Sequence, residues 1–294
     1  MKKLLFFILS GIVAFSSCKK KGDEANPFSD VKNLGVGSYL ILNKVIGKNI
    51  DFTNFNASQV GIEVDRYPGG EEVDRIEIYV VKGASVDASK WKKVKTVTFT
   101  GPNTKLTVTG AEMATAFGLT PADFPPGSSY TFYNRLFTKS GKAYDVTNTG
   151  NNGGSGLITG SYYSSAFTFS AFVICAWTQA STDGTVWTID EDGWEDFAPG
   201  SQFTMQNGPG ANQVTMVGVY PTSYMHKDVV LDINPATGEV TIAKQAYGGY
   251  SNGGTIYSAE GSGYIFSCSD KLDLSVTHTS PGSNFGAFKF VAHR

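Results

Sequence analysis

Apolar and polar residues alternate in short runs along the first half of this chain, between residues 39 and 137. The clearest runs are Val60-Ile62-Val64, Ile76-Ile78-Val80, Val97-Phe99, Leu106-Val108 and Tyr130-Phe132. A period of two is typical of strands with one buried face. Turn residues such as Pro125-Pro126-Gly127 separate the runs. About seven strands at this spacing predict an immunoglobulin-like β-sandwich over residues 34–175.

One stretch of this half interrupts the strand pattern. Residues Thr109 to Leu119 are rich in helix formers, with Ala114, Phe117 and Gly118 on one face. The stretch predicts one short helix that ends near Gly118.

A second series of strands follows the segment Ala166–Trp177, which is apolar on both faces and is therefore expected to be covered on both. Its runs are Val186–Ile189, Phe203–Met205, Val214–Val219, Val229–Ile233, Val240–Ala243, Thr255–Tyr257, Tyr264–Cys268, Leu272–Val276 and Phe288–Val291. Asn234–Gly238 predicts a hairpin turn. Residues 176–294 are thus expected to form an antiparallel β domain, either a barrel or a sandwich. Tyr264 and Phe266 are expected to face inward.

The amino-terminal residues carry a targeting pattern. Two lysines precede a dozen apolar residues and the small residues Ser16 and Ser17, which is typical of a secretory signal over residues 1–17. Cys18 then resembles the lipobox cysteine of bacterial lipoproteins, where the new terminal cysteine is acylated. An incidental cysteine after an ordinary signal is the alternative. Residues 18–33 read as a polar tether.

Composition narrows the class of protein. Without Lys2 and Lys3 the chain has 22 basic and 26 acidic residues, and it shows no basic patch with interleaved aromatic residues. Nucleic acid is therefore not an expected partner. Many Thr, Val, Tyr and Phe residues and 34 glycines favour an all-β extracytoplasmic protein.

With Cys18 acylated, Cys175 and Cys268 remain as a pair in an oxidising compartment. The sequence leaves open whether they form a disulfide or stay as two buried thiols, because geometry and not spacing decides the bond.

The sequence contains none of the common catalytic or metal-binding motifs. There is no G-x-S-x-G elbow, no H-E-x-x-H, no Cys-x-x-Cys and no phosphate-binding glycine loop. Ser223, His226 and Asp228 lie too close together in sequence for a triad. The acidic run Asp190–Asp196 fails the EF-hand spacing and is expected to be an exposed turn. We expect no catalytic residue, metal or cofactor, although a hydrolase without a motif stays a third alternative.

Aromatic residues supply the candidate ligand contacts, since flat rings beside polar groups suit the apolar faces of sugars. The candidates are Trp187, Trp194, Tyr247 and Tyr250. Trp194, between Gly193 and Glu195, is the best candidate for an exposed ring. The alternative for each ring is packing in the core or at its rim.

The order of several motifs resembles a known family. The motifs that follow the lipobox are Leu106–Glu112, Gly118–Thr120, Tyr130–Phe132, Phe172–Cys175 and Asp232–Val240. Together they are similar to the SusE-like accessory surface lipoproteins that accompany the SusC/SusD nutrient-uptake systems of Bacteroidota. The resemblance implies an outer-membrane location, β-sandwich modules and a TonB-dependent transporter with its lid lipoprotein as partners. It implies no catalytic residue and carries over no ligand residue.

Two functions are therefore expected. The first is a non-enzymatic outer-membrane lipoprotein, anchored by its lipid at the cell surface or facing the periplasm, that binds a glycan or another nutrient. The second is a structural or adhesive surface lipoprotein without a small ligand. An exposed aromatic cluster favours the first, and a large apolar patch favours the second.

Overall fold

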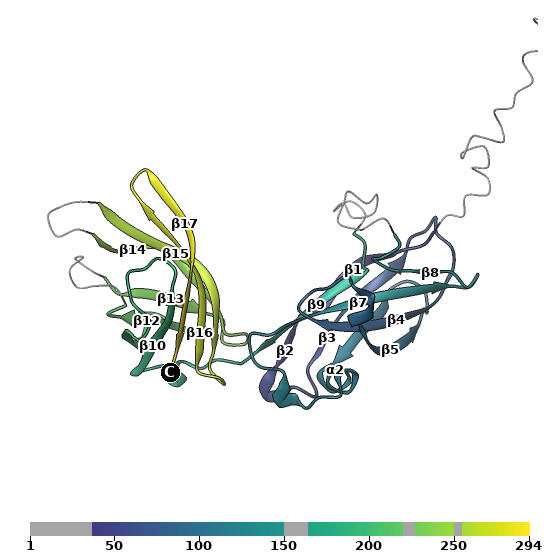
Figure 1. The fold of residues 1–294 in the computed structure, drawn as a ribbon, viewed down its shortest axis with the longest axis horizontal. Coiled ribbons are helices and arrows are strands. Elements are labelled where there is room, and N and C mark those ends of the chain that lie inside the picture. Colours follow the sequence, from purple (N-terminus) through teal and green to yellow (C-terminus); the bar gives the residue numbers. More distant parts are fainter. Residues whose placement is uncertain (1–36, 150–163, 220–226, 250–254) are drawn as a thin grey trace, which may run out of the picture. The chain divides into compact units, whose positions relative to one another are not determined.

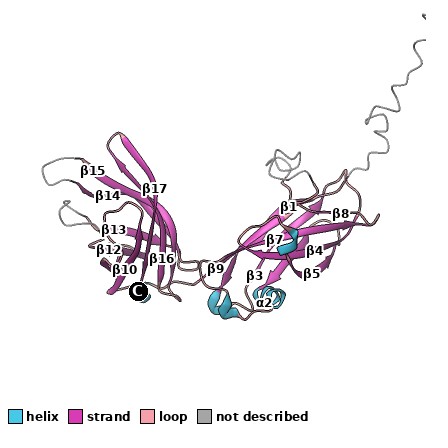
Figure 2. Cartoon of the chain, viewed as in Figure 1, coloured by secondary structure: helices cyan, strands magenta, loops and turns pink. Residues whose placement is uncertain are grey.

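The structure is a computed structural model that describes residues 37–149, 164–219, 227–249 and 255–294 (Figure 1). Residues Ser38–Arg294 form one compact unit. The expected signal peptide, Cys18 and nearly all of the segment that leads to the first strand lie outside the described residues. Strands are the main secondary structure of the described chain, which has one short α-helix, as the sequence pattern predicts (Figure 2).

The first half is a sandwich of two sheets in immunoglobulin-like order. Its strands are β1 (Leu40–Gly47), β2 (Asn49–Asp51), β3 (Gln59–Arg66), β4 (Val73–Lys82), β5 (Lys92–Thr98), β6 (Thr104–Thr109), β7 (Ser129–Thr138), β8 (Ala143–Tyr144) and β9 (Thr168–Ile174). One sheet has the order β1-β3-β6 and the other β2-β9-β7-β4-β5, with β8 paired to β7. β2 runs parallel to β9, and the other neighbours are antiparallel. The chain therefore changes sheets between β1 and β2.

The predicted helix is α2 (Gly110–Phe117), and its ends follow from its sequence. The Thr109 side chain accepts a hydrogen bond from the Glu112 backbone N–H, while the Glu112 carboxylate accepts one from the Thr109 N–H. This capping box satisfies two amide groups that the helix itself leaves unpaired. Met113 lies on the buried face, whereas Gly118 is exposed and ends the helix with a φ of 68°.

Four 3₁₀ turns complete the described helical structure. They are η1 (Phe52–Asn54), η2 (Ala88–Lys90), η3 (Pro121–Asp123) and η5 (Gln179–Ser181).

The second half is a closed eight-stranded antiparallel barrel. Its strands are β10 (Thr185–Asp192), β11 (Gln202–Asn207), β12 (Gln213–Val217), β13 (Val229–Ile233), β14 (Glu239–Gly249), β15 (Ile256–Phe266), β16 (Lys271–Ser280) and β17 (Ser283–His293). Each strand pairs with the next in sequence, and β17 pairs with β10, with Thr188 opposite His293. Closure leaves no open edge along the sheet. The predicted hairpin turn Asn234–Gly238 joins β13 to β14, and Gly238 adopts a φ of 68°.

The expected inward orientation of Tyr264 and Phe266 is wrong. Ile265, between them on β15, is fully buried in the barrel core, so its two neighbours point to the outer face. Phe266 is nevertheless buried, because its ring packs against that of Phe172 on β9 at 6.0 Å between centroids. Burial of Phe266 thus reflects a contact outside the barrel, which the alternation along β15 could not distinguish from a core position.

Candidate ligand-binding end of the barrel

Aromatic side chains gather at one end of the barrel, where β10, β14 and β16 finish and β15 and β17 begin; Phe288 contacts Trp194 and His278 there, and five others form a closed cycle. We call them the ring cluster: Trp194, Tyr247, Tyr257, His278 and Phe285. They come from four different strands and from the turn after β10. Only the antiparallel up-and-down topology brings these sequence positions to the same end.

The ring cluster is a closed cycle of contacts. Trp194 stacks on His278 at 4.5 Å and meets Phe285 at 5.3 Å. Phe285 meets Tyr257 at 6.1 Å, and Tyr257 meets Tyr247 at 6.3 Å. Tyr247 closes the cycle edge-on against His278 at 5.4 Å. Each ring thus contacts at least two others at separations typical of attractive aromatic pairs.

Asp192 fixes the turn that carries Trp194. Its carboxylate accepts hydrogen bonds from the backbone N–H groups of Trp194, Asp196 and Phe197, at 3.0, 3.0 and 3.1 Å. The Gly193 N–H donates to the Lys289 carbonyl on β17. The Asp192 carboxylate thus holds the turn in shape, and the turn positions the indole of Trp194.

Burial shifts the acid–base properties of three groups at this end. Burial, aided by the charge of Asp192, raises the pKa of Asp196 to about 6, although a hydrogen bond from Trp194 opposes the shift. Burial and the nearby Asp196 raise the pKa of Tyr247 above its usual range. Burial lowers the pKa of His278 to about 4. His278 is therefore neutral at pH 7, and its Nδ1 shares a 2.9 Å hydrogen bond with the Tyr247 hydroxyl.

The members of the ring cluster differ in their access to solvent. Tyr247 and His278 are each 2% exposed, while Trp194 and Tyr257 are partly buried. Phe285 is 41% exposed and offers the most accessible ring of the five. Phe285 is therefore the ring of the cluster that a ligand from solution reaches most easily.

The barrel interior below the ring cluster is filled by side chains. The space bordered by Met216, Val229, Ile242, Ala259, Leu274, Val276 and Phe290 measures only about 10 Å³. That is at most the room for one water molecule. This part of the barrel holds a packed apolar core, and an organic ligand would not fit there without displacing side chains.

The structure separates the aromatic residues that the sequence grouped together. Trp187 is 1% exposed in the barrel core, where its ring N–H donates to Thr185 Oγ1 at 2.8 Å. Trp187 is thus a packing residue. Trp194 and Tyr247 belong to the ring cluster, but Trp194 is partly buried between other rings and is not a flat exposed platform. Tyr250 lies outside the described residues.

Sequence reasoning missed Phe285, His278 and Asp196 as members of this end. No sequence motif singles out His278, and Asp196 belongs to the acidic run that the sequence predicts to be an exposed turn. Among the described residues, no group of three or more His, Cys, Asp or Glu side chains is arranged to hold a metal ion. The strand pairing Thr277–Ala287 and His278–Gly286 is what carries Phe285 to the cluster, and no local signal encodes that pairing.

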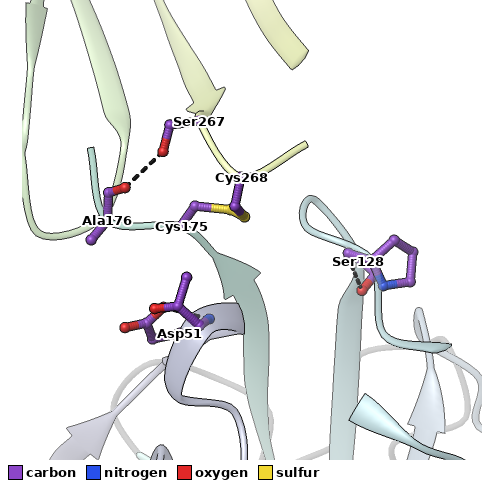
Figure 3. The surroundings of a disulfide bond; sticks show 8 residues. Asp51, Ser128, Cys175, Ala176, Ser267 and Cys268 are labelled. Carbon is purple, nitrogen blue, oxygen red and sulfur yellow. Dashed lines mark hydrogen bonds between the residues drawn. A yellow bond between two sulfur atoms is a disulfide. The ribbon is translucent and has the colours of Figure 1, made fainter. Parts of the chain in front are cut away.

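Cys175 and Cys268 form a disulfide, which is one of the two alternatives that the sequence left open (Figure 3). Their Cα atoms are 5.9 Å apart, within the usual range for this bond. The bond joins the end of β9 to the turn between β15 and β16. Beside it, the Ser267 hydroxyl donates a hydrogen bond to the Ala176 carbonyl at 2.7 Å. A disulfide and a hydrogen bond thus both connect the segment after β9 to the segment after β15.

No protein-family model matches this chain, and no curated protein matches it. Among the residues that the structure describes, none of the helices is long and apolar enough to cross a membrane.

Proposed function

We propose that this chain is a non-enzymatic outer-membrane lipoprotein, anchored through Cys18, that binds a glycan or another nutrient as an accessory to a Sus-like uptake system. The ring cluster at the end of the barrel is the single observation that carries the binding role. The signal pattern of residues 1–17 and the family resemblance support the location and the partners, a TonB-dependent transporter and its lid lipoprotein.

The chemistry of the ring cluster suits a sugar. A pyranose has apolar C–H faces that stack on aromatic rings, and hydroxyl groups that need polar partners at the edge. Phe285 and Trp194 offer ring surface, and Asp196 places a half-buried carboxyl beside them. Because the barrel interior is filled, we assign the binding surface to this end and not to a cavity inside the barrel.

Phe285 is the residue of choice for a test, because truncating an exposed ring leaves the core intact. A glycan array with the purified lipidated protein in detergent should identify a bound glycan. Phe285→Ala should then weaken binding about tenfold, as expected when a stacking contact is lost. Val186→Ala is the matched control, since Val186 is 50% exposed on the outer barrel face away from the cluster. Absence of any bound glycan, or equal affinity of the two variants, would contradict the proposal.

The lipid anchor has its own test. Metabolic labelling with a fatty acid should mark the wild-type protein, and Cys18→Ala should abolish the label and release the protein from the membrane fraction. Retention of Cys18→Ala in the membrane would contradict acylation at this position.

One observation favours the structural or adhesive alternative. On β1, Val45 is 52% exposed, and Leu42 and Ile46 are each 36% exposed. β1 is an edge strand of its sheet. By contrast β5, an edge strand of the other sheet, carries Lys92 and Lys93, and lysines are a common protection of an edge against pairing. Under this alternative no glycan binds, and Val45→Lys lowers the adhesion of cells that display the protein.

A further inference from the structure

A groove of about 420 Å³ lies far from the ring cluster, beside the turn between β15 and β16. One side is formed by Phe172 on β9 and by Gly127, and the other by the outer face of β15 and β16. Its volume falls in the range of small-molecule binding sites. The groove shares no residue with the ring cluster.

Three aromatic rings line the groove. Tyr264 and Phe266 follow each other on the outer face of β15 and lie almost parallel, with 13° between their planes and 5.8 Å between centroids. Phe172 is tilted against Tyr264 at 4.7 Å. Phe266 is buried, while Tyr264 and Phe172 are partly exposed. The accessible ring surface therefore belongs to Tyr264 and Phe172, supported from behind by Phe266.

Polar groups stand next to these rings on the adjoining strand. Asp273 is the cross-strand partner of Tyr264, and Lys271 is that of Phe266. Their side chains form an ion pair at 3.3 Å and are partly exposed. One row further along, Ser262 and Ser275 pair across the same strands and also line the groove. The groove thus combines ring faces with a carboxylate, an ammonium and two hydroxyl groups.

The disulfide holds the two sides of the groove together. Cys175 lies three residues after Phe172, and Cys268 lies two residues after Phe266. Gly127 approaches Phe266 so closely that a Cβ at this position would lie 3.2 Å from the ring. A site whose walls are fixed in advance loses less conformational entropy when a ligand binds.

We propose that this groove is a second binding site, and that it takes a neutral oligosaccharide. The rings of Tyr264 and Phe172 stack on the C–H faces of sugar units, and Asp273, Lys271, Ser262 and Ser275 bind the hydroxyl groups. The ligand is uncharged because the carboxylate and the ammonium of the groove balance each other. The Tyr264 hydroxyl adds a hydrogen-bond donor and acceptor at the edge of this ring surface.

The experiment separates this groove from the ring cluster by using the Phe285→Ala protein, in which the exposed ring of the cluster is removed. Isothermal titration calorimetry with maltotetraose, cellotetraose, xylotetraose and mannotetraose should detect binding of at least one of them to this protein. Adding Tyr264→Ala should weaken that binding about tenfold through the lost stacking contact. Adding Asp273→Asn, which preserves the shape of the side chain, should weaken it severalfold.

Glu260→Gln is the control, because Glu260 lies on the outer face of the same strand but does not line the groove. It should leave the affinity within about twofold. The inference is overturned if none of the four tetrasaccharides binds the Phe285→Ala protein, or if Tyr264→Ala and Asp273→Asn bind as tightly as Glu260→Gln. Either result leaves the proposed function at the ring cluster standing, because that function is tested by Phe285→Ala against Val186→Ala.

Discussion

The indole of Trp194 lies almost parallel to the imidazole of His278, with 5° between the ring planes and 4.5 Å between the centroids. One partner comes from a turn and the other from the end of β16, and the stack closes the cycle of five rings at the end of the barrel. Because burial keeps His278 neutral at pH 7, the contact is a stack of two neutral rings under physiological conditions. Its stability should therefore depend on pH in a predictable way.

Asp196 should make the protein less stable as the pH rises from 4 to 7. Its folded-state pKa of about 6 lies above its ordinary value, so its contribution to stability is present at low pH and is lost as the pH rises through 6. Relative to Asp196→Asn, the free energy of unfolding of the wild type should fall by about 1–2 kcal/mol over this range, allowing for partial exposure. Urea unfolding at several pH values measures this difference, and a difference that is constant with pH would contradict it.

His278 should act in the opposite direction. Its folded-state pKa of about 4 lies below its ordinary value, so the stability from the neutral ring is present above about pH 6.5 and is lost as the pH falls through 4. Relative to His278→Gln, the wild type should gain about 2–3 kcal/mol of unfolding free energy between pH 4 and 7. Urea unfolding over the same pH values tests this. The stability difference between wild type and His278→Gln should rise with pH, whereas that between wild type and Asp196→Asn should fall. If both stability differences changed with pH in the same direction, the opposite pKa shifts of Asp196 and His278 would be refuted.

The disulfide should contribute strongly to stability, because it closes a span of 93 residues. Replacing both Cys175 and Cys268 with Ser should lower the free energy of unfolding by about 4 kcal/mol in the chain-entropy model. Guanidinium unfolding measures the loss. When a strong reductant breaks the disulfide, the wild type and the variant should have the same free energy of unfolding. If reductant leaves the wild-type transition in place, the bond does not have this role.

Gly127 and Gly141 form a matched pair for the groove. Both adopt a left-handed backbone, with φ of 84° and 85°, but a Cβ at 127 would lie 3.2 Å from the Phe266 ring, whereas one at 141 would meet no atom within 4 Å. Gly141→Ala should cost about 1–2 kcal/mol from backbone strain alone. Gly127→Ala should cost about 1 kcal/mol more, because the ring must shift. Thermal unfolding compares the two, and equal losses would show that Phe266 is not packed against this turn.

Much of the fold was accessible from local patterns. The alternation in Val60–Val64 and Ile76–Val80 predicts β3 and β4, and Asn234–Gly238 predicts the β13–β14 turn, because side-chain period and turn chemistry act over a few residues. The helix at Thr109–Leu119 was predicted for the same reason. The site was harder to predict, since Phe285 joins Trp194 through the pairing of β17 with β10 and β16, strands that are remote in sequence.

By itself, the sequence determined the all-β class, the positions of most strands, and the availability of Cys175 and Cys268 for a bond. Only the tertiary structure decided that the second half closes into a barrel, that Trp187 lies in its core and Trp194 at its end, and that Phe266 is buried on the outer face. The physical reason is that alternation marks two faces of a strand but not what covers each one. Burial of a face depends on partners brought in from distant parts of the chain, such as β17 against β10 and Phe172 against Phe266.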